Sequence, residues 1–191
     1  QGILLKGVTG SGKTEVYVRA ADQALAMGGM ALILVPEIAL TVQMVSYFAH
    51  HFGDDVVFIH SQLSKGERYN NRMRVERGES HVIIGSRSAL FMPFRNLRFI
   101  VVDEEYDSSY KQDETPRYNG CDLAKVMAVT YQCPIVLGAA TPSVNTYYAA
   151  KTNRISLITM NKRVFETPLP EVSIVDMKQP QALVQSPLFC D

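Results

Sequence analysis

Apolar and polar positions alternate along the chain in two different ways. Short runs such as ALILV (31–35) and FIVV (99–102) are apolar at every position, whereas the segments between such runs place apolar residues at helical spacing. Uninterrupted apolar runs are typical of parallel strands that are covered on both faces. Because strands that alternate with helices form βαβ units, the pattern predicts a three-layer α/β fold with a mainly parallel central sheet.

The same pattern gives approximate bounds for the elements. In the first predicted helix Val16, Ala20, Ala24 and Met27 recur at helical spacing, so we expect this face to be buried. Gly28 and Gly29 follow the helix and end it. We expect strands at 3–6, 31–35, 56–60, 82–85, 99–102 and 135–138, and helices at 13–27, 39–52, 64–78, 121–132 and 143–151.

The pattern changes after about Arg163. Residues 167–170 read TPLP, which is typical of a linker, and residues 172–175 read as one more strand. We therefore expect one lobe over 1–166, followed over 167–191 by a linker and the start of a second lobe that the chain does not contain.

Composition leaves the kind of partner open. The chain is 47% hydrophobic and 20% charged, and its 19 basic and 19 acidic residues cancel. The charges are segregated, because residues 65–98 hold eight basic and three acidic residues, whereas residues 99–114 hold six acidic residues and one lysine. Such blocks form either solvated faces that balance each other or an anion-binding face beside a cation-binding one.

Cysteine usage and hydropathy favour a cytoplasmic protein. Cys121, Cys133 and Cys190 are far apart and form no CxxC pair, which argues against a disulfide scaffold or a zinc site within this chain. No apolar run approaches the roughly 20 residues that span a bilayer, so we expect no membrane association. The chain begins at Gln1 without a visible export signal, and we expect it to be a piece of a longer protein.

Residues 7–14 read GVTGSGKT, a complete G-x-x-x-x-G-K-[ST] pattern between a predicted strand and a predicted helix. Glycines let successive backbone N–H groups turn toward an anion, and the helix N-terminus adds partial positive charge. Lys13 is expected to reach the β- and γ-phosphates of ATP, and the Thr14 hydroxyl to ligate Mg²⁺. The alternative is a Gly/Ser turn that happens to precede a helix. The expected ATP-binding residues are Gly7, Val8, Thr9, Gly10, Ser11, Gly12, Lys13 and Thr14.

Four carboxylates follow the apolar run 99–102, in the sequence VVDEEYD (101–107). An aspartate at the end of a strand near a phosphate loop supplies a second anchor for the metal, so we expect Asp103 to bind Mg²⁺. Glu104 is then placed to orient or deprotonate the attacking water, and with Lys13 it is an expected catalytic residue. The alternative is an acidic loop that caps a strand end, and we expect Glu105 and Asp107 to be structural or solvated.

Three further motifs also follow predicted strands, namely LVPEIALT (34–41), IIGSRSALFMPF (83–94) and LGAATPS (137–143). In order and spacing, the chain resembles the first RecA-like motor lobe of superfamily 2 helicases. The segments GVTGSGKTEVY, LVPEIALT, GSRSALFMPF, DEEYDSSYKQ and ATPS resemble, more closely, the replication-restart helicase family of primosomal protein N′ (PriA). The resemblance covers roughly residues 3–177 and implies a RecA-like P-loop NTPase lobe.

The resemblance also implies a function and a set of partners. It implies the motor lobe of a DNA-dependent ATPase and 3′-to-5′ DNA helicase that uses ATP and Mg²⁺ and acts in primosome assembly. The implied partners are single-stranded and forked DNA, a single-stranded-DNA-binding protein and other primosome proteins, in a nucleoid-associated location. Zinc is implied only for a downstream part outside this chain, and the lobe alone is expected to hydrolyse ATP weakly or not at all.

Residues that match the strand-tracking motifs of the family are expected to contact the phosphate backbone of DNA. For Arg87 the alternative is a surface ion pair. For the basic helix at 64–78 we favour a solvated face over a DNA contact. The expected DNA-binding residues are Pro36, Glu37, Thr41, Gly85, Ser86 and Arg87.

The segment 108–120 resembles an aromatic-rich loop that couples DNA binding to ATP hydrolysis in that family. Its Tyr110 and Tyr118, interleaved with Lys111 and Arg117, provide stacking faces beside cations, as single strands require. The alternative is a loop whose tyrosines pack on the surface. The expected coupling residues are Tyr106, Tyr110, Tyr118, Ala139 and Thr141.

The chain departs from the family pattern at three places. Tyr106 replaces a histidine and Ala139 a serine, and we hypothesise that volume is exchanged across a contact between these two positions. Cys121 stands where a cation is usual, which weakens a DNA contact there. The remaining alternatives are a non-catalytic, nucleotide-dependent module that binds DNA or protein, and another superfamily 2 translocase.

Overall fold

The computed structural model describes residues 1–164, which form a seven-stranded sheet in the order β3-β4-β2-β5-β8-β1-β9. Every neighbouring pair of strands in this sheet is parallel, which confirms the predicted fold class. The strands are β1 (Gly2–Gly7), β2 (Met30–Leu34), β3 (Val56–Ile59), β4 (Val82–Gly85), β5 (Leu97–Val102), β8 (Ile135–Ala139) and β9 (Ser156–Met160).

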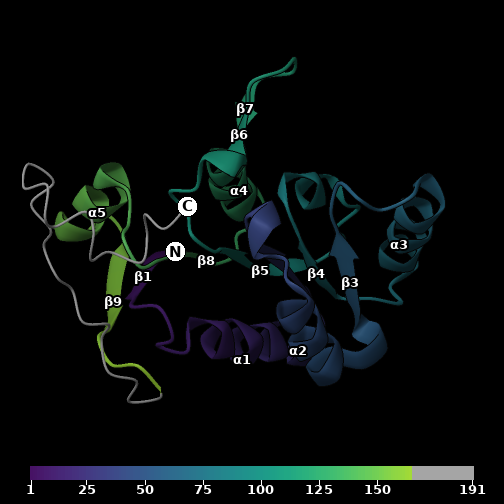
Figure 1. Ribbon diagram of the computed structural model, residues 1–191, viewed down its shortest axis with the longest axis horizontal. Helices are drawn as coiled ribbons and strands as arrows, with labels where there is room; N and C mark the ends of the chain where they lie inside the picture. The colour runs from purple at the N-terminus through teal and green to yellow at the C-terminus, as the bar shows by residue number, and fades with distance from the viewer. Residues whose placement is uncertain (165–191) are drawn as a thin grey trace, which may run out of the picture.

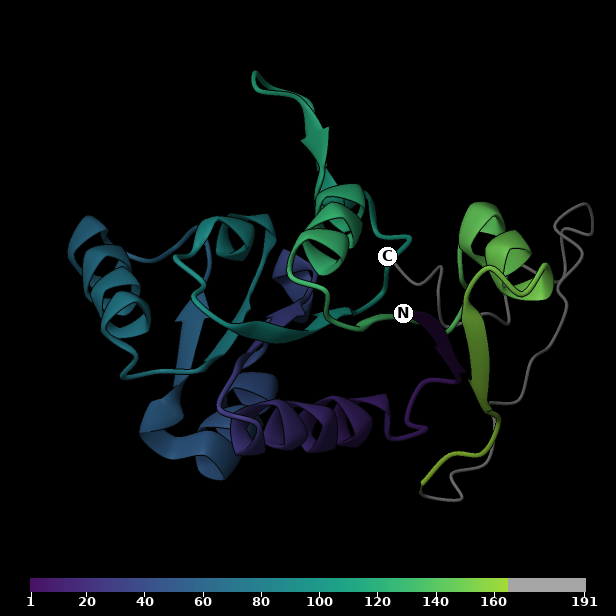
Figure 2. The ribbon, with the colours of Figure 1, turned by 180° about the vertical axis from the view of Figure 1, so that it is seen from behind.

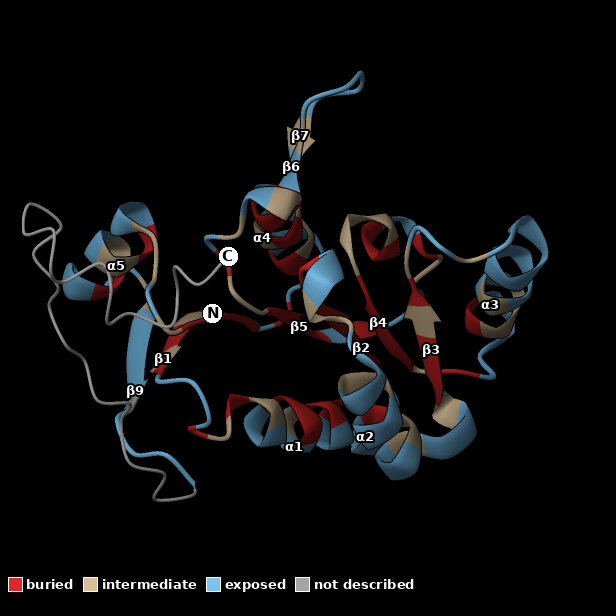
Figure 3. Ribbon diagram, in the orientation of Figure 1, coloured by how far each residue is buried: buried red, intermediate tan, exposed pale blue. Residues whose placement is uncertain are grey.

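Helices cover both faces of the sheet (Figure 1). On one face lie α1 (Lys13–Ala26) and α2 (Val42–Phe52), and on the other lie α3 (Lys65–Arg77), α4 (Gly120–Thr130) and α5 (Val144–Lys151). The view from behind shows the same arrangement, with α3 and α5 at opposite ends of the sheet (Figure 2). Buried residues follow the central strands and the helix faces turned toward them (Figure 3), so two apolar clusters sandwich the sheet.

Short elements complete the connections. Four 3₁₀ helices follow strands or a helix: η1 (Glu37–Ala39), η2 (Gly53–Asp55), η3 (Arg87–Phe91) and η4 (Ser108–Tyr110). The predicted aromatic-rich loop contains a small antiparallel hairpin, β6 (Lys111–Gln112) with β7 (Tyr118–Asn119). This β6–β7 hairpin projects from the body of the lobe beside α4 (Figure 1).

The ends of α2 and α3 follow their capping residues. The predicted helix at 39–52 begins too early, because Thr41 caps α2 by accepting a hydrogen bond from the Met44 backbone N–H at 3.3 Å. The preceding residues form η1 instead. The predicted helix at 64–78 agrees with α3, where Ser64 and Glu67 form a capping box and Gly78 ends the helix at φ 72°.

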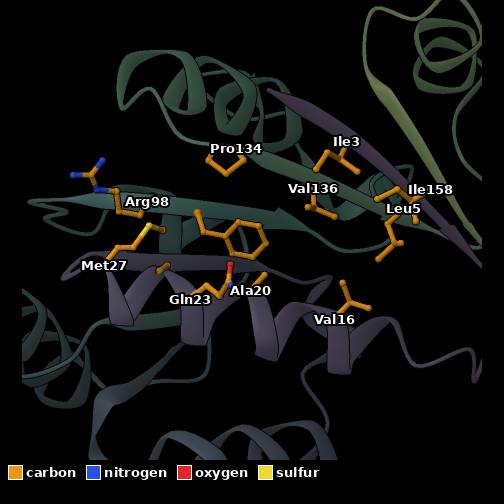
Figure 4. Close-up of a pocket in the computed structure, with 12 residues that line it drawn as sticks. Ile3, Leu5, Val16, Ala20, Gln23, Met27, Arg98, Pro134, Val136 and Ile158 are labelled. Atoms are coloured by element: carbon orange, nitrogen blue, oxygen red, sulfur yellow. The ribbon is translucent and has the colours of Figure 1, made fainter.

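The predicted apolar face of α1 is only partly buried. Val16 and Met27 are 38% and 64% exposed, whereas the buried face consists of Tyr17, Val18, Ala21 and Ala24. Figure 4 shows the reason: the Val16 and Met27 side of α1 borders a hollow of about 270 Å³ between the helix and the strands β1, β5, β8 and β9. Helical spacing alone therefore predicted a face of α1 that is rotated about the helix axis relative to the face that packs on the sheet.

Sequence analysis missed β9. Four of its five residues are exposed, and it lies at the edge of the sheet beside β1. An edge strand with this exposure carries neither the apolar run of a central strand nor a clear alternation. The predicted linker and strand at 167–170 and 172–175 lie outside the described residues. Among residues 1–164, no helix is long and apolar enough to cross a membrane.

Candidate functional site

The loop between β1 and α1 has the conformation of a phosphate-binding loop. Gly10 and Gly12 adopt φ values of 77° and 88°, which residues with a Cβ rarely adopt, and Lys13 opens the helix. The Ser11 Oγ atom is buried and has no hydrogen-bond partner among the described residues. An unpaired buried hydroxyl in a glycine-rich loop at a helix N-terminus fits a bound phosphate group, which would supply the missing partner.

Lys13 is held in the middle of this loop. Its Nζ atom donates to the Gly7 carbonyl at 3.0 Å and lies 3.4 Å from Glu104 Oε1. The residue is 9% exposed, so water screens its charge only weakly and its attraction to a nearby anion is strengthened. Both contacts are to oxygen atoms, the atom type that a nucleotide phosphate presents. This position suits the predicted contact between Lys13 and a phosphate, which stays a prediction.

Asp103 follows the end of β5 and faces the phosphate loop. Its Oδ1 atom accepts a hydrogen bond from the Tyr17 hydroxyl at 2.7 Å, and its backbone carbonyl accepts one from the Tyr110 hydroxyl at 2.7 Å. Burial raises the pKa of the Asp103 carboxyl above its ordinary value, and the Tyr17 hydrogen bond partly opposes this. A divalent cation would compensate the buried charge, so the surroundings of Asp103 fit a metal ligand.

Tyr17 is a site residue that the sequence analysis missed. Burial raises the pKa of its phenol, so the hydroxyl remains a donor toward Asp103. Tyr17 lies four residues after Lys13 on α1, and this spacing placed it on the same helix face, one turn into the core. A Cβ atom at Gly138 in β8 would overlap the Tyr17 hydroxyl, so the pair formed by Tyr17 and Asp103 requires a glycine there.

Glu104 occupies a strained backbone position beside Asp103. Its φ of 45° is unusual for a residue other than glycine, and such conformations concentrate at functional sites. Its Oε1 atom faces Lys13, and its Oε2 atom accepts a long hydrogen bond of 3.5 Å from the Ala140 backbone N–H. Glu104 therefore links the phosphate loop to the segment that follows β8.

Lys13, Asp103 and Glu104 line one hollow of about 410 Å³. Val164 closes one side of it, and its backbone N–H donates to the Gly10 carbonyl at 2.9 Å. The residues present fit Mg²⁺-ATP: the loop would cradle the phosphates, and Thr14 and Asp103 would hold the metal. All the predicted ATP-binding residues except Gly7 line this hollow, namely Val8, Thr9, Gly10, Ser11, Gly12, Lys13 and Thr14.

Glu105 is structural, one of the two roles expected for it, and it is buried. Its carboxylate accepts hydrogen bonds from the Ser143 backbone N–H at 2.7 Å, the Ser143 hydroxyl at 3.2 Å and the Thr146 hydroxyl at 3.1 Å. Its own N–H donates to the Gly138 carbonyl at 3.0 Å. This Glu105 network joins the end of β5 to the start of α5, and no sequence pattern indicated Ser143 or Thr146 as its partners.

The predicted DNA-binding residues lie at the ends of β2 and β4, and two of them are buried. Pro36 and Gly85 are buried, so the Pro36 ring is not exposed, and Gly85 has no side chain to offer. The predicted contact of these two positions with DNA stays a prediction. Gly85 is required by packing, because a Cβ atom there would overlap the Ile59 carbonyl of β3. Glu37 accepts a hydrogen bond from the Ser61 backbone N–H at 3.1 Å, which lowers the pKa of its carboxyl. A carboxylate repels phosphate, so this contact suits Glu37 to positioning the loop after β3.

The remaining predicted DNA-binding residues are accessible. Thr41 is exposed at the start of α2, and Ser86 is half-buried before η3. Arg87 forms no ion pair with any carboxylate within residues 1–164, and its guanidinium donates instead to the Lys111 backbone carbonyl in the β6–β7 hairpin. The surface ion pair considered for Arg87 is therefore absent from the described part of the chain.

The predicted coupling residues differ in how far each is buried. Tyr110 is 1% exposed, so its expected role as a stacking face is wrong in this structure, because the ring packs in the core while its hydroxyl reaches Asp103. Tyr118 is partly exposed and packs edge-on against Phe91, with ring centroids 5.6 Å apart. Tyr106 is half exposed, Thr141 is exposed and Ala139 is fully buried. The proposed exchange of volume between Tyr106 and Ala139 stays a prediction.

Cys121 does not offer a surface to a ligand. It is 4% exposed at the start of α4, and burial raises the pKa of its thiol to about 11. Asn119 precedes it and caps the helix, accepting hydrogen bonds from the backbone N–H groups of Cys121 and Asp122. The position that departs from the family pattern therefore packs inside the lobe.

Comparisons with known proteins agree with this geometry. A family model described as DEAD/DEAH box helicase matches residues 1–149. The chain is 47% identical over 176 residues to replication restart protein PriA of Bacillus subtilis (strain 168), covering 92% of this chain and 22% of that protein. It is 43% identical over 181 residues to the protein of the same name from Synechocystis sp., with the same shares covered. The chain thus spans about a fifth of the length of these relatives.

Solved structures show the same fold at lower identity. The DUF1998 helicase MrfA bound to DNA matches with a TM-score of 0.58 and 19% identity, covering 85% of this chain and 25% of that one. RecG bound to a three-way DNA junction matches with a TM-score of 0.58 and 20% identity, covering 90% of this chain and 22% of that one. These structural matches support a RecA-like lobe.

Proposed function

The chain belongs to the DEAD/DEAH box helicase family, and from this we propose that it is the ATP-binding motor lobe of a DNA-dependent ATPase. We propose further that the whole protein is a 3′-to-5′ DNA helicase that acts in replication restart. The similarity to two replication restart proteins over 92% of the chain supports this assignment.

One observation carries the proposal. Lys13 and the adjacent residues Asp103 and Glu104 come from two distant parts of the chain and line one hollow together with a glycine-rich loop. A structural ion-pair network also brings charged residues together, but in such a network each polar group has a partner. Here the Ser11 hydroxyl lacks a partner among the described residues, and the buried Asp103 carboxylate is paired with the Tyr17 phenol. This combination suits binding and hydrolysis of a nucleoside triphosphate.

Each residue has a role that follows from its position. The loop N–H groups and Lys13 would bind and orient the phosphates, and Thr14 and Asp103 would hold Mg²⁺. When bound, Mg²⁺ neutralises charge that develops on the phosphate oxygens. Glu104 would accept a proton from the attacking water at its carboxylate, which Lys13 and the Ala140 N–H already orient.

We propose the following partners on the basis of the family resemblance. They are single-stranded and forked DNA, a single-stranded-DNA-binding protein and other primosome proteins, met in the cytoplasm near the nucleoid. We also propose that residues 1–166 form the lobe and residues 167–191 lead to a second one, and that zinc belongs to a part of the protein outside this chain. Without arginine fingers from a second lobe, the chain alone would hydrolyse ATP weakly.

The test is ATP hydrolysis by the full-length protein, without DNA and with single-stranded or duplex DNA. We expect DNA to stimulate turnover, and Lys13→Ala and Glu104→Gln to abolish it, while Arg19→Ala, an exposed residue of α1, leaves it unchanged. Tight nucleotide binding without turnover would favour a non-catalytic nucleotide-dependent module. Turnover that responds only to duplex DNA would favour another translocase of the superfamily.

A further inference from the structure

A third hollow, of about 600 Å³, lies between α3 and η3 at the end of the sheet opposite α5. We call it the α3–η3 hollow. Its α3 wall is formed by Lys65, Arg68, Tyr69 and Arg72, which recur at the spacing of a single helix face. Its η3 wall includes Ser88 and Phe91, which lie one and four residues after the predicted DNA-binding residue Arg87.

The cations of this hollow have no carboxylate partner among residues 1–164. Arg77 at the other end of α3 pairs with Glu79, but Lys65, Arg68 and Arg72 form no ion pair in the described part of the chain. Like charges three and four residues apart destabilise a helix, and a bound anion would relieve that repulsion. The expectation of a merely solvated helix therefore leaves this face of α3 unexplained.

Two aromatic rings stand beside these cations. Tyr69 is 62% exposed and Phe91 is 55% exposed, although burying an aromatic ring of this size usually stabilises a fold. Phe91 is fixed edge-on against Tyr118 of the β6–β7 hairpin, with the rings at 90°. A ligand that carries both phosphates and flat rings would satisfy cations and aromatic faces together, and single-stranded nucleic acid has this chemistry.

Two further observations concern the side of the hollow next to the predicted DNA-binding residues. Ser88 Oγ is buried without a hydrogen-bond partner, a state that among the described residues it shares only with Ser11 of the phosphate loop. Arg87, one residue before Ser88, holds the carbonyl of Lys111 at the base of the hairpin. The α3–η3 hollow is thus continuous with Ser86 and Arg87 through η3.

We propose that the α3–η3 hollow is a subsite for single-stranded DNA, in which Lys65, Arg68 and Arg72 bind phosphates and Tyr69 and Phe91 hold a base. The proposal rests on the DNA-dependent function proposed above. It adds α3, which no family motif includes, to the DNA-binding surface.

Crosslinking tests the location directly. The photoreactive residue p-benzoylphenylalanine is placed at Tyr69 or, as a control, at Tyr148 of α5, which is similarly exposed at 60%. We expect labelled oligothymidylate to crosslink to the chain at position 69 and not at position 148. Equal crosslinking at both positions, or none at 69, would overturn the proposal.

Binding measurements test the energetics. We expect the double variant Arg68→Gln with Arg72→Gln to weaken oligothymidylate binding, and to reduce the slope of log K against log salt by about 1.4, or about 0.7 for each lost phosphate contact. Tyr69→Ala should weaken binding about tenfold with an unchanged slope. The control is Arg77→Gln with Arg154→Gln, which removes the same charge from exposed positions outside the hollow. Circular dichroism checks that each variant is folded.

The outcomes separate this inference from the proposed function. If DNA stimulates ATP hydrolysis but the hollow variants match the control in affinity and slope, this inference alone is wrong. If the unmodified chain neither binds DNA nor responds to it, the proposed function fails as well. If the hollow variants lose affinity for polyglutamate but keep it for oligothymidylate, the hollow binds an acidic protein segment and the DNA assignment is wrong.

Discussion

Asp103 is held by groups from distant parts of the chain. The Tyr17 hydroxyl of α1 reaches its carboxylate, the Tyr110 hydroxyl of η4 reaches its carbonyl, and its backbone N–H donates to the Leu34 carbonyl at the end of β2. Groups that orient a metal ligand matter almost as much as the ligand itself. At the scale of single residues, the proposed metal site therefore depends on two tyrosines as well as on the acidic sequence.

The two tyrosines allow a matched test of this arrangement. Tyr17→Phe removes the donor to the Asp103 carboxylate, so we expect the Mg²⁺ concentration for half-maximal ATP hydrolysis to rise about tenfold. Tyr110→Phe removes an equally buried hydroxyl, but one that faces the backbone carbonyl, so it should lower stability without changing the Mg²⁺ requirement. Equal effects of both variants on the Mg²⁺ requirement would contradict this role for Tyr17.

Sequence reasoning identified site residues that belong to a recognisable motif. It missed site residues that reach the site only because the chain folds and packs. Lys13, Asp103 and Glu104 were predicted, and the structure brings them to one hollow. Tyr17 and the partners of Glu105 were missed, because a hydrogen bond between residues 86 or 38 positions apart leaves no local pattern. Tyr110 was predicted for the wrong reason, since a tyrosine in an aromatic-rich segment can point inward as readily as outward.

At the scale of elements, strand β8 must have a glycine at position 138 to leave room for the Tyr17–Asp103 pair. Gly138 lies within this buried strand, where a glycine lowers strand stability unless another group needs the space. Here the space is taken by the Tyr17 hydroxyl and by Asp103 Oδ1, which would lie 2.9 Å from a Cβ atom at that position. The glycine of the LGAATPS motif is thus explained by the neighbouring pair.

Gly138→Ala should therefore damage both stability and nucleotide binding. We expect the free energy of unfolding to fall by about 1–3 kcal/mol, the usual cost of overpacking a core, with loss of ATP hydrolysis. Gly66→Ala is the control, because a Cβ there meets nothing within 4 Å, and it should raise stability by roughly 0.4–1 kcal/mol. Urea denaturation measures both, and a Gly138→Ala chain as stable as the Gly66→Ala chain would argue against the steric explanation.

The elements that sequence reasoning missed or placed wrongly share a physical cause. Central strands and capped helices were predicted because burial on both faces and capping residues leave local signals. The edge strand β9, the helix face of α1 beside the open hollow and the two-residue strands of the hairpin depend on what lies next to them. Local sequence carries little information about such neighbours.

At the scale of the whole molecule, the residues proposed to bind nucleotide and those predicted to bind DNA follow the carboxyl ends of neighbouring strands of one sheet. Strand β5 leads to Asp103 and Glu104 of the nucleotide hollow, while β2 and β4 lead to the predicted DNA-binding residues. The 3₁₀ helix η4 joins them in sequence, since it connects the acidic turn to the β6–β7 hairpin that Arg87 contacts. The hollow lined by Lys13, Asp103 and Glu104 is therefore connected through few contacts to the predicted DNA-binding residues.

Nucleotide binding should stabilise the whole lobe, and the two catalytic candidates should separate binding from turnover. A ligand at one hundred times its dissociation constant adds about 2.7 kcal/mol, or about 5–10 °C in the unfolding temperature of a chain of this size. Lys13→Ala should lose both the shift caused by Mg²⁺-ATP and the turnover. Glu104→Gln removes a negative charge 3.4 Å from Lys13, so it should keep the shift or increase it while turnover falls about 10²- to 10⁴-fold.

Thermal unfolding with and without Mg²⁺-ATP, alongside ATP hydrolysis, measures this separation. The Arg19→Ala chain controls for the loss of a charge on α1 outside the hollow. If Glu104→Gln loses the thermal shift as completely as Lys13→Ala does, Glu104 acts in nucleotide binding or in folding of the acidic turn. Its assignment as the residue that accepts the proton from water would then be wrong, because a general base is needed for turnover and not for binding.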